Sequence, residues 1–194
     1  LRAAARFALK HDLAAVGLDD LLSGGQSQAR AGTLRGEKRV KDSLPRLLVG
    51  TNWFLGYSHT SKAKDQFIKS YQTRDNIADI LTVFFKYGVN AIMGMPEPIL
   101  RDAIEMAQDR TGREAILILT PHFSILPGDP EEAEPERVFD RCKELGATFC
   151  FPHQCVTDRI IDRLHGVIRG MDKYSEMIRE RGMIPGLSTH MPES

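Results

Sequence analysis

The sequence is poor in cysteine and has no excess of charge of either sign. Three cysteines occur among 194 residues, and Lys plus Arg equal Asp plus Glu at 26 each. A low, odd cysteine count is not that of a disulfide framework, so a reducing cytoplasm is the expected location. The balanced charge provides no net field that would favour nucleic acid or an anionic membrane as a partner.

Long apolar runs are also missing from the chain. No run reaches the roughly 18 to 20 residues that a membrane span needs. The N-terminal run LRAAARFALKHDLAAVG carries charges where a signal peptide would have its apolar core. Because the chain begins with Leu1 and ends at MPES, directly after a strand-like run, both ends suggest a fragment.

Two regions of different composition meet near residue 44. Residues 1–43 combine a helical pattern over 3–16 with the small and polar run SGGQSQARAGTLRGEKRVKD, which predicts an N-terminal helix and a flexible linker. Residues 44–194 instead alternate short, continuously apolar runs with longer helical patterns. Such runs are typical of strands buried on both faces of a parallel sheet. The predicted strands are 46–52, 89–95, 115–121, 147–152 and 183–189.

The strand–helix repeat fits either an open doubly wound sheet or a (β/α)8 barrel. The first strand leads into GTNWFLGYSH, which lacks the G-x-G-x-x-G pattern of dinucleotide-binding sheets. Residues that can bind ligands follow every strand, which favours the barrel. A complete barrel typically needs about 250 residues. The expected fold is therefore α/β, a partial (β/α)8 TIM barrel with about five parallel strands, truncated and preceded by the N-terminal extension.

Four of the six histidines follow four different predicted strands. Parallel strands bring their C-terminal ends to one edge, so these imidazoles can converge on a divalent metal such as zinc, iron or manganese. Without a metal they can act as acids or bases near neutral pH. The ordinary alternative is that each histidine hydrogen-bonds a carbonyl or water, and no local H-x-H or H-E-x-x-H motif is present. The candidate ligands are His59, His122, His153 and His190.

Other residues at the same predicted edge are candidates for catalysis or substrate binding. His153, Glu97 and Glu193 are the candidate acids and bases. Cys155 is compatible with a metal ligand, but residues two apart that leave a strand can point to opposite sides, which favours packing for this thiol. For the aromatic Trp53, packing in the core competes with a pocket role. The candidate substrate-binding residues are Asn52, Trp53 and Tyr57.

Short segments resemble the aldo/keto reductase-type barrels. MIPGLSTHMPES resembles a strand and turn that those proteins read roughly as I-R-x-x-G-x-S-x-H/N-x-x-E, and ATFCFPHQCVTD is similar in placement to the strand that brings their catalytic histidine. His153 is the matching position. RLLVGTNWFLGYSHTSKAKD looks like the opening of a group of barrel proteins of unassigned function. The resemblance covers about Leu44 to Ser194 and implies a barrel, with NADPH-dependent oxidoreduction as a possible activity.

The catalytic set of the aldo/keto reductases is incomplete in this chain. Those enzymes carry an Asp and a Tyr after early strands and a Lys on the next, whereas MGMPEP and TPH follow the second and third strands here. The first expectation is therefore a barrel enzyme, metal-assisted, that acts on a small polar metabolite as a hydrolase, lyase or isomerase. An NADPH-dependent oxidoreductase and a non-catalytic barrel protein are the alternatives. Because an incomplete barrel leaves sheet edges unpaired, self-association is also expected.

Overall fold

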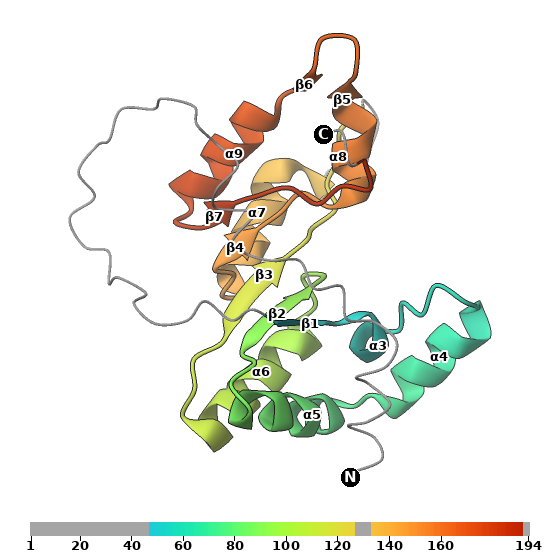
Figure 1. Ribbon diagram of the computed structural model, residues 1–194, viewed down its shortest axis with the longest axis vertical. Helices are drawn as coiled ribbons and strands as arrows, with labels where there is room; N and C mark the ends of the chain where they lie inside the picture. Colours follow the sequence, from blue (N-terminus) through green and yellow to red (C-terminus); the bar gives the residue numbers. More distant parts are fainter. Residues whose placement is uncertain (1–46, 127–132, 192–194) are drawn as a thin grey trace, which may run out of the picture.

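A computed structural model describes residues 47–126 and 133–191 of the chain (Figure 1). The N-terminal helix and linker expected over residues 1–43, and the candidate base Glu193, lie outside these residues.

A five-stranded parallel sheet forms the centre of the described chain (Figure 1). Each strand lies inside one of the predicted apolar runs, so the expectation of an α/β fold with a parallel sheet is confirmed. Strands that follow one another among these five also pair in space, with no reversal of order, and the sheet is open. In spatial order the strands are β1 (Leu48–Gly50), β2 (Ala91–Gly94), β3 (Ile116–Leu119), β4 (Phe149–Cys150) and β7 (Ile184–Pro185).

Local sequence determines where the helices begin and end. Thr73 caps α5 by accepting a hydrogen bond from the Asn76 N–H at 3.2 Å, and Asp75 lies in the first turn. The runs KYG, RTG, ELG and ERG predict helix ends at a left-handed glycine, and glycines with positive φ do follow four helices and lead into the next strands. These glycines are Gly88, Gly112, Gly146 and Gly182. The helices are α3 (Asn52–Leu55), α4 (Lys62–Tyr71), α5 (Arg74–Lys86), α6 (Pro98–Thr111), α7 (Pro135–Glu144), α8 (Gln154–Ile160) and α9 (Met171–Glu180).

Helices and one face of the sheet share a single apolar core. The strand register places Val49, Ile92 and Leu117 side by side, and all three belong to this core. Buried residues of α5, α6, α7 and α9 pack against them. The opposite face carries Phe149, which pairs with Ile184, and Ile184 is 52% exposed. The two faces of the sheet therefore differ in how fully they are covered.

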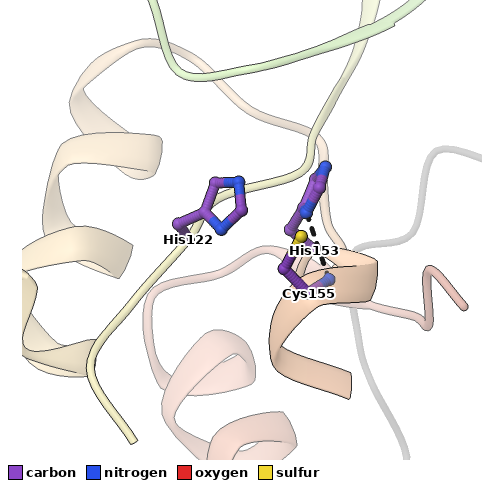
Figure 2. Close-up of side chains that lie close together, drawn as sticks. All are labelled: His122, His153 and Cys155. Atoms are coloured by element: carbon purple, nitrogen blue, oxygen red, sulfur yellow. Dashed lines mark hydrogen bonds between the residues drawn. The ribbon is translucent and has the colours of Figure 1, made fainter. Parts of the chain in front are cut away.

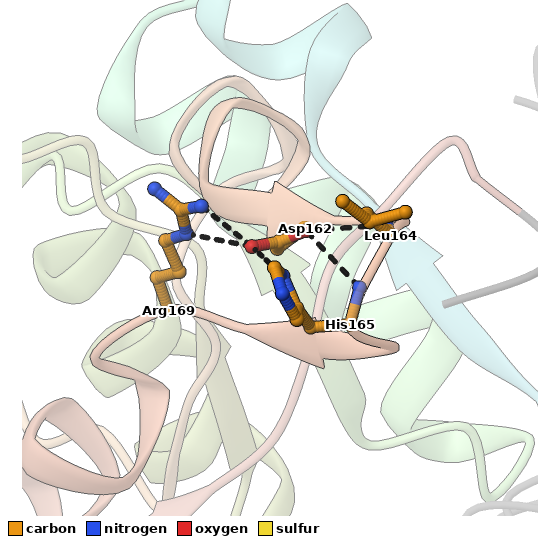
Figure 3. A network of polar contacts seen from close by, with 4 residues as sticks. All are labelled: Asp162, Leu164, His165 and Arg169. Carbon is orange, nitrogen blue, oxygen red and sulfur yellow. Dashed lines mark hydrogen bonds and ion pairs between the residues drawn. The ribbon is translucent and has the colours of Figure 1, made fainter.

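The run VTDRIIDRLHGVIRGMDKYSEMIRERG (156–182) predicts one long helical segment before the last strand, and this prediction was wrong. The structure has α8, an antiparallel hairpin of β5 (Ile161–Asp162) and β6 (Val167–Ile168), and then α9. Gly166 and Gly170 adopt positive φ around the hairpin, a conformation that the helix cannot continue through. The Asp162 carboxylate accepts hydrogen bonds from the backbone N–H groups of Leu164 and His165, which fixes the turn (Figure 3). None of the helices in the described ranges is long and apolar enough to cross a bilayer.

Close packing between β1 and β2 predicts a large difference between two glycine substitutions. A Cβ at Gly94 would lie 2.0 Å from Oγ1 of the buried Thr51, whereas a Cβ at Gly50 would meet nothing within 4 Å. We expect G94A to lower the free energy of unfolding by about 1–3 kcal/mol and G50A to change it by less than about 0.5 kcal/mol. Urea denaturation measures both, and equal effects would contradict the packing described here.

Candidate functional site

The pairing of β3 with β4 brings two of the candidate histidines together. Leu119 is the register partner of Cys150, and the ladder continues through the Phe151 N–H, which donates to the Leu119 carbonyl at 2.9 Å. One step further, the His153 N–H donates to the Pro121 carbonyl at 3.0 Å. His122 and His153 thereby become neighbours on adjacent segments of the chain, with ring centroids 4.1 Å apart.

The start of α8 adds a third potential ligand. His153 is the N-cap residue, and its Nδ1 accepts a hydrogen bond from the Cys155 N–H at 3.3 Å. Because the chain turns into a helix here, Cys155 comes round to the side of His153 instead of the opposite side. Figure 2 shows His122 on the segment after β3, with His153 and Cys155 at the beginning of α8. The packing role that the sequence favoured for Cys155 is wrong, because this side chain is exposed.

These three residues form a compact group, here called the His–Cys cluster. One ring nitrogen of His122, one of His153 and the Cys155 sulfur all lie within 4.8 Å of one another. Within residues 47–126 and 133–191, no other group of three His, Cys, Asp or Glu residues meets this spacing. His122 and Cys155 are exposed, and His153 is half-buried.

The surroundings of the cluster keep both imidazoles neutral. The pKa of His153 is lowered to about 4: burial contributes most, the neighbouring imidazoles of His122 and His190 add to the decrease, and Asp158 opposes it. Partial desolvation of the His122 ring also lowers its pKa, with a second contribution from the charge of Arg159. Neutral imidazole is the form that binds metals and accepts protons. The cluster is therefore ready for either role at neutral pH.

The chain that follows β7 is attached to α8 next to the cluster. The Asp158 carboxylate accepts hydrogen bonds from the Thr189 hydroxyl at 2.7 Å and from the His190 N–H at 3.3 Å. His190 is therefore near enough to influence His153, but its ring does not belong to the His–Cys cluster.

The remaining described candidates lie after β1 and β2, and four of them form two contacting pairs. The Asn52 amide nitrogen is 2.9 Å from Nε2 of His59, and the Tyr57 hydroxyl donates to the Glu97 carboxylate at 3.4 Å. Burial, then the charge of Glu97 and this hydrogen bond, raise the pKa of Tyr57, so the phenol keeps its proton. Trp53 is 41% exposed, which does not fit a core aromatic. His59 thus pairs with an amide and lies outside the His–Cys cluster.

Comparisons with protein-family models, with curated proteins and with solved structures find no match to this chain. The fold and the site define its class: a mixed α/β protein with an open parallel sheet and an exposed His/Cys group at the C-terminal ends of β3 and β4. The resemblance to aldo/keto reductases stays a prediction.

The environment of His153 predicts an unusual titration. We expect the imidazole of His153 to titrate with a midpoint near 4, below the ordinary value of about 6.5. Between those pH values the unfolded chain binds more protons than the folded one, so this residue makes stability fall as the pH is lowered from 6.5 to 4. Histidine NMR shifts measure the midpoint. In H122Q it should rise, because a neighbouring imidazole is lost, and a wild-type midpoint near 6.5 would contradict the site.

Proposed function

We propose that this chain is part of a barrel-type α/β enzyme whose His–Cys cluster binds a divalent metal, through which it acts on a small polar metabolite. One observation carries the proposal: three potential ligand atoms on the segments that follow two neighbouring parallel strands lie within 4.8 Å of one another. The C-terminal ends of the strands are where barrel enzymes place their active sites.

The ligand set favours zinc among the expected metals. Catalytic zinc sites use three protein ligands of the N, S or O type and leave the fourth position to water or substrate. The exposure of His122 and Cys155 leaves room for that fourth ligand. Zn–N and Zn–S bonds of about 2.0–2.3 Å place tetrahedral ligands roughly 3.4–3.7 Å apart. The three side chains therefore need to approach by about 1 Å, a shift open to exposed side chains at a loop and a helix start.

Metal binding would require Cys155 to lose its proton, and the ring nitrogen used decides whether His153 must also change its tautomer. The Cys155 thiol releases its proton to become the thiolate that metals prefer. Nδ1 of His153 accepts the Cys155 N–H, so the neutral ring carries its proton on Nε2. If the metal bound Nδ1, it would replace the 3.3 Å hydrogen bond from the Cys155 N–H. The proton would stay on Nε2, which could donate a hydrogen bond. Binding through Nε2 would instead require the other tautomer.

A metal in this position would lower the pKa of its bound water or polarise a substrate carbonyl, as a hydrolase, lyase or isomerase requires. Glu97 is the proposed base among the described residues, and the Tyr57 hydroxyl that donates to it would keep its carboxylate oriented. Asn52 and the exposed Trp53 are the proposed substrate contacts. The roles of His190 and Glu193 stay predictions, as does NADPH use.

The sheet supports a barrel architecture for the whole domain. Its five strands run in sequential order, and one face packs against the four crossover helices α5, α6, α7 and α9. A doubly wound sheet would reverse its strand order and carry helices on both faces. The second face of the sheet is partly exposed and includes Ile184. We propose that, in a solution that contains only this chain, a second copy covers that face.

Zinc binding tests the metal site. The metal-free chain should bind one equivalent of zinc, and cobalt should give the near-ultraviolet absorption of a thiolate–cobalt bond. H122Q, H153Q and C155S should each weaken zinc binding by more than about 100-fold, because each removes a direct ligand. H59Q is the matched control, since it removes a histidine at the same sheet edge but outside the cluster. Its affinity should equal that of the wild type.

Absence of zinc, iron and manganese binding would overturn the proposal. So would metal binding that H59Q weakens as strongly as H153Q does. A chain that binds no metal but changes its Trp53 fluorescence on addition of NADPH would favour the oxidoreductase alternative.

The oligomeric state tests the exposed face. We expect the 21.7 kDa chain to sediment as a species larger than the monomer, and I184D to shift it toward the monomer by placing a charge on the exposed face of β7. V167D is the matched control, because Val167 is 50% exposed in the hairpin and lies away from the sheet. A monodisperse wild-type monomer would contradict this part of the proposal.

A further inference from the structure

A pocket rich in arginine lies where α8 passes into the β5–β6 hairpin. Its volume is about 380 Å³, which falls in the lower part of the range of small-molecule sites. Three of its six lining residues carry a guanidinium group, and one carries a carboxylate. The lining residues are Arg159, Ile160, Ile161, Asp162, Arg163 and Arg169.

The carboxylate in this arginine pocket, Asp162, is already bonded to neighbouring side chains. Asp162 accepts hydrogen bonds from Nε and Nη2 of Arg169 and from Nδ1 of His165 (Figure 3). These bonds lower its pKa to about 2, with the Arg169 hydrogen bonds contributing most. Asp162 therefore stays ionised, holds Arg169 at the rim and closes the hairpin. It is bound within the hairpin and is not a counter-ion for the other two arginines.

Arg159 is the guanidinium best placed to receive a ligand. No carboxylate in the described part of the chain lies within ion-pair distance of it. Arg163 already donates to the Met191 sulfur at 3.0 Å, and Nε and Nη2 of Arg169 are bonded to Asp162. Arg159 and Nη1 of Arg169 therefore offer the N–H donors of this pocket that match the oxygens of a phosphate group. A carboxylate is satisfied by one such fork, whereas a phosphate monoester, with a charge near −2, can use several.

The arginine pocket and the His–Cys cluster share α8. Cys155 and Arg159 are four residues apart within this helix, so they lie on the same face, separated by about 6 Å along the axis. The charge of Arg159 also reaches His122 and lowers the pKa of that imidazole. A ligand one helical turn long could therefore contact both sites.

We propose that the arginine pocket binds the phosphate group of a phosphorylated small metabolite and directs the rest of that molecule toward the His–Cys cluster. The inference rests on the proposed function for the identity of the reacting site. The binding of phosphate in the pocket is a separate physical claim, and it can be tested without metal or activity.

Binding of inorganic phosphate to the metal-free chain tests the pocket, measured by calorimetry and by NMR shifts of the arginine side chains at constant ionic strength. R159Q should weaken phosphate binding about 10- to 100-fold, since it removes charge-assisted hydrogen bonds. R179Q is the matched control: Arg179 is exposed on α9 and lies outside the pocket. Its phosphate affinity should equal that of the wild type. Acetate should bind more weakly than phosphate in all variants.

Cluster variants separate this inference from the metal proposal. H153Q and C155S should bind phosphate as the wild type does, because their substitutions lie outside the pocket. R159Q should keep zinc binding or strengthen it, because a positive charge near His122 is removed. Three results would each overturn phosphate binding in this pocket, whatever the zinc result. They are loss of phosphate binding in H153Q, equal losses in R159Q and R179Q, and no phosphate binding at all. Acetate binding as tight as phosphate would overturn the assignment to phosphate.

Discussion

The parallel pairing between β3 and β4 is the constraint on which the candidate site depends. The ladder continues beyond the last strand residues, through the His153 N–H to the Pro121 carbonyl. Paired residues on neighbouring parallel strands share a face. His122 and His153, which follow the two strands, are therefore brought side by side. The imidazoles of His122 and His153, 31 positions apart in the sequence, therefore have ring centroids 4.1 Å apart. Buried Pro121 and Pro152, directly before them, hold this approach in place.

The helix that follows β4 then determines what can surround those imidazoles. Its N-cap hydrogen bond brings Cys155 to His153, and Asp158, one turn further, holds the chain after β7 against the same helix. Arg159 follows directly and enters the arginine pocket. One short helix thus carries a thiol, an attachment point and a guanidinium group at Cys155, Asp158 and Arg159. Its position is determined in turn by Val156, which is buried in the shared core.

Much of the fold could be predicted from local patterns. The five strands lie inside continuously apolar runs, and Gly88, Gly112, Gly146 and Gly182 follow four helices with the expected positive φ. Such features depend on neighbouring residues alone. The β5–β6 hairpin was missed because its residues continue a helical pattern on either side. The available clue was Asp162 with Gly166 and Gly170, a turn-forming residue followed by two helix-breaking glycines.

By itself, the sequence determined the order of the five strands of the parallel sheet, the parallel α/β class and the fact that histidines follow the strands. Only the tertiary structure decided which of those histidines meet. His59 turns to Asn52, whereas His122 and His153 meet and are joined by Cys155. Strand order brings residues to an edge, but strand register and the direction of the first turn after each strand select the neighbours. Those two properties arise from main-chain hydrogen bonds between segments distant in the sequence, which local patterns do not encode.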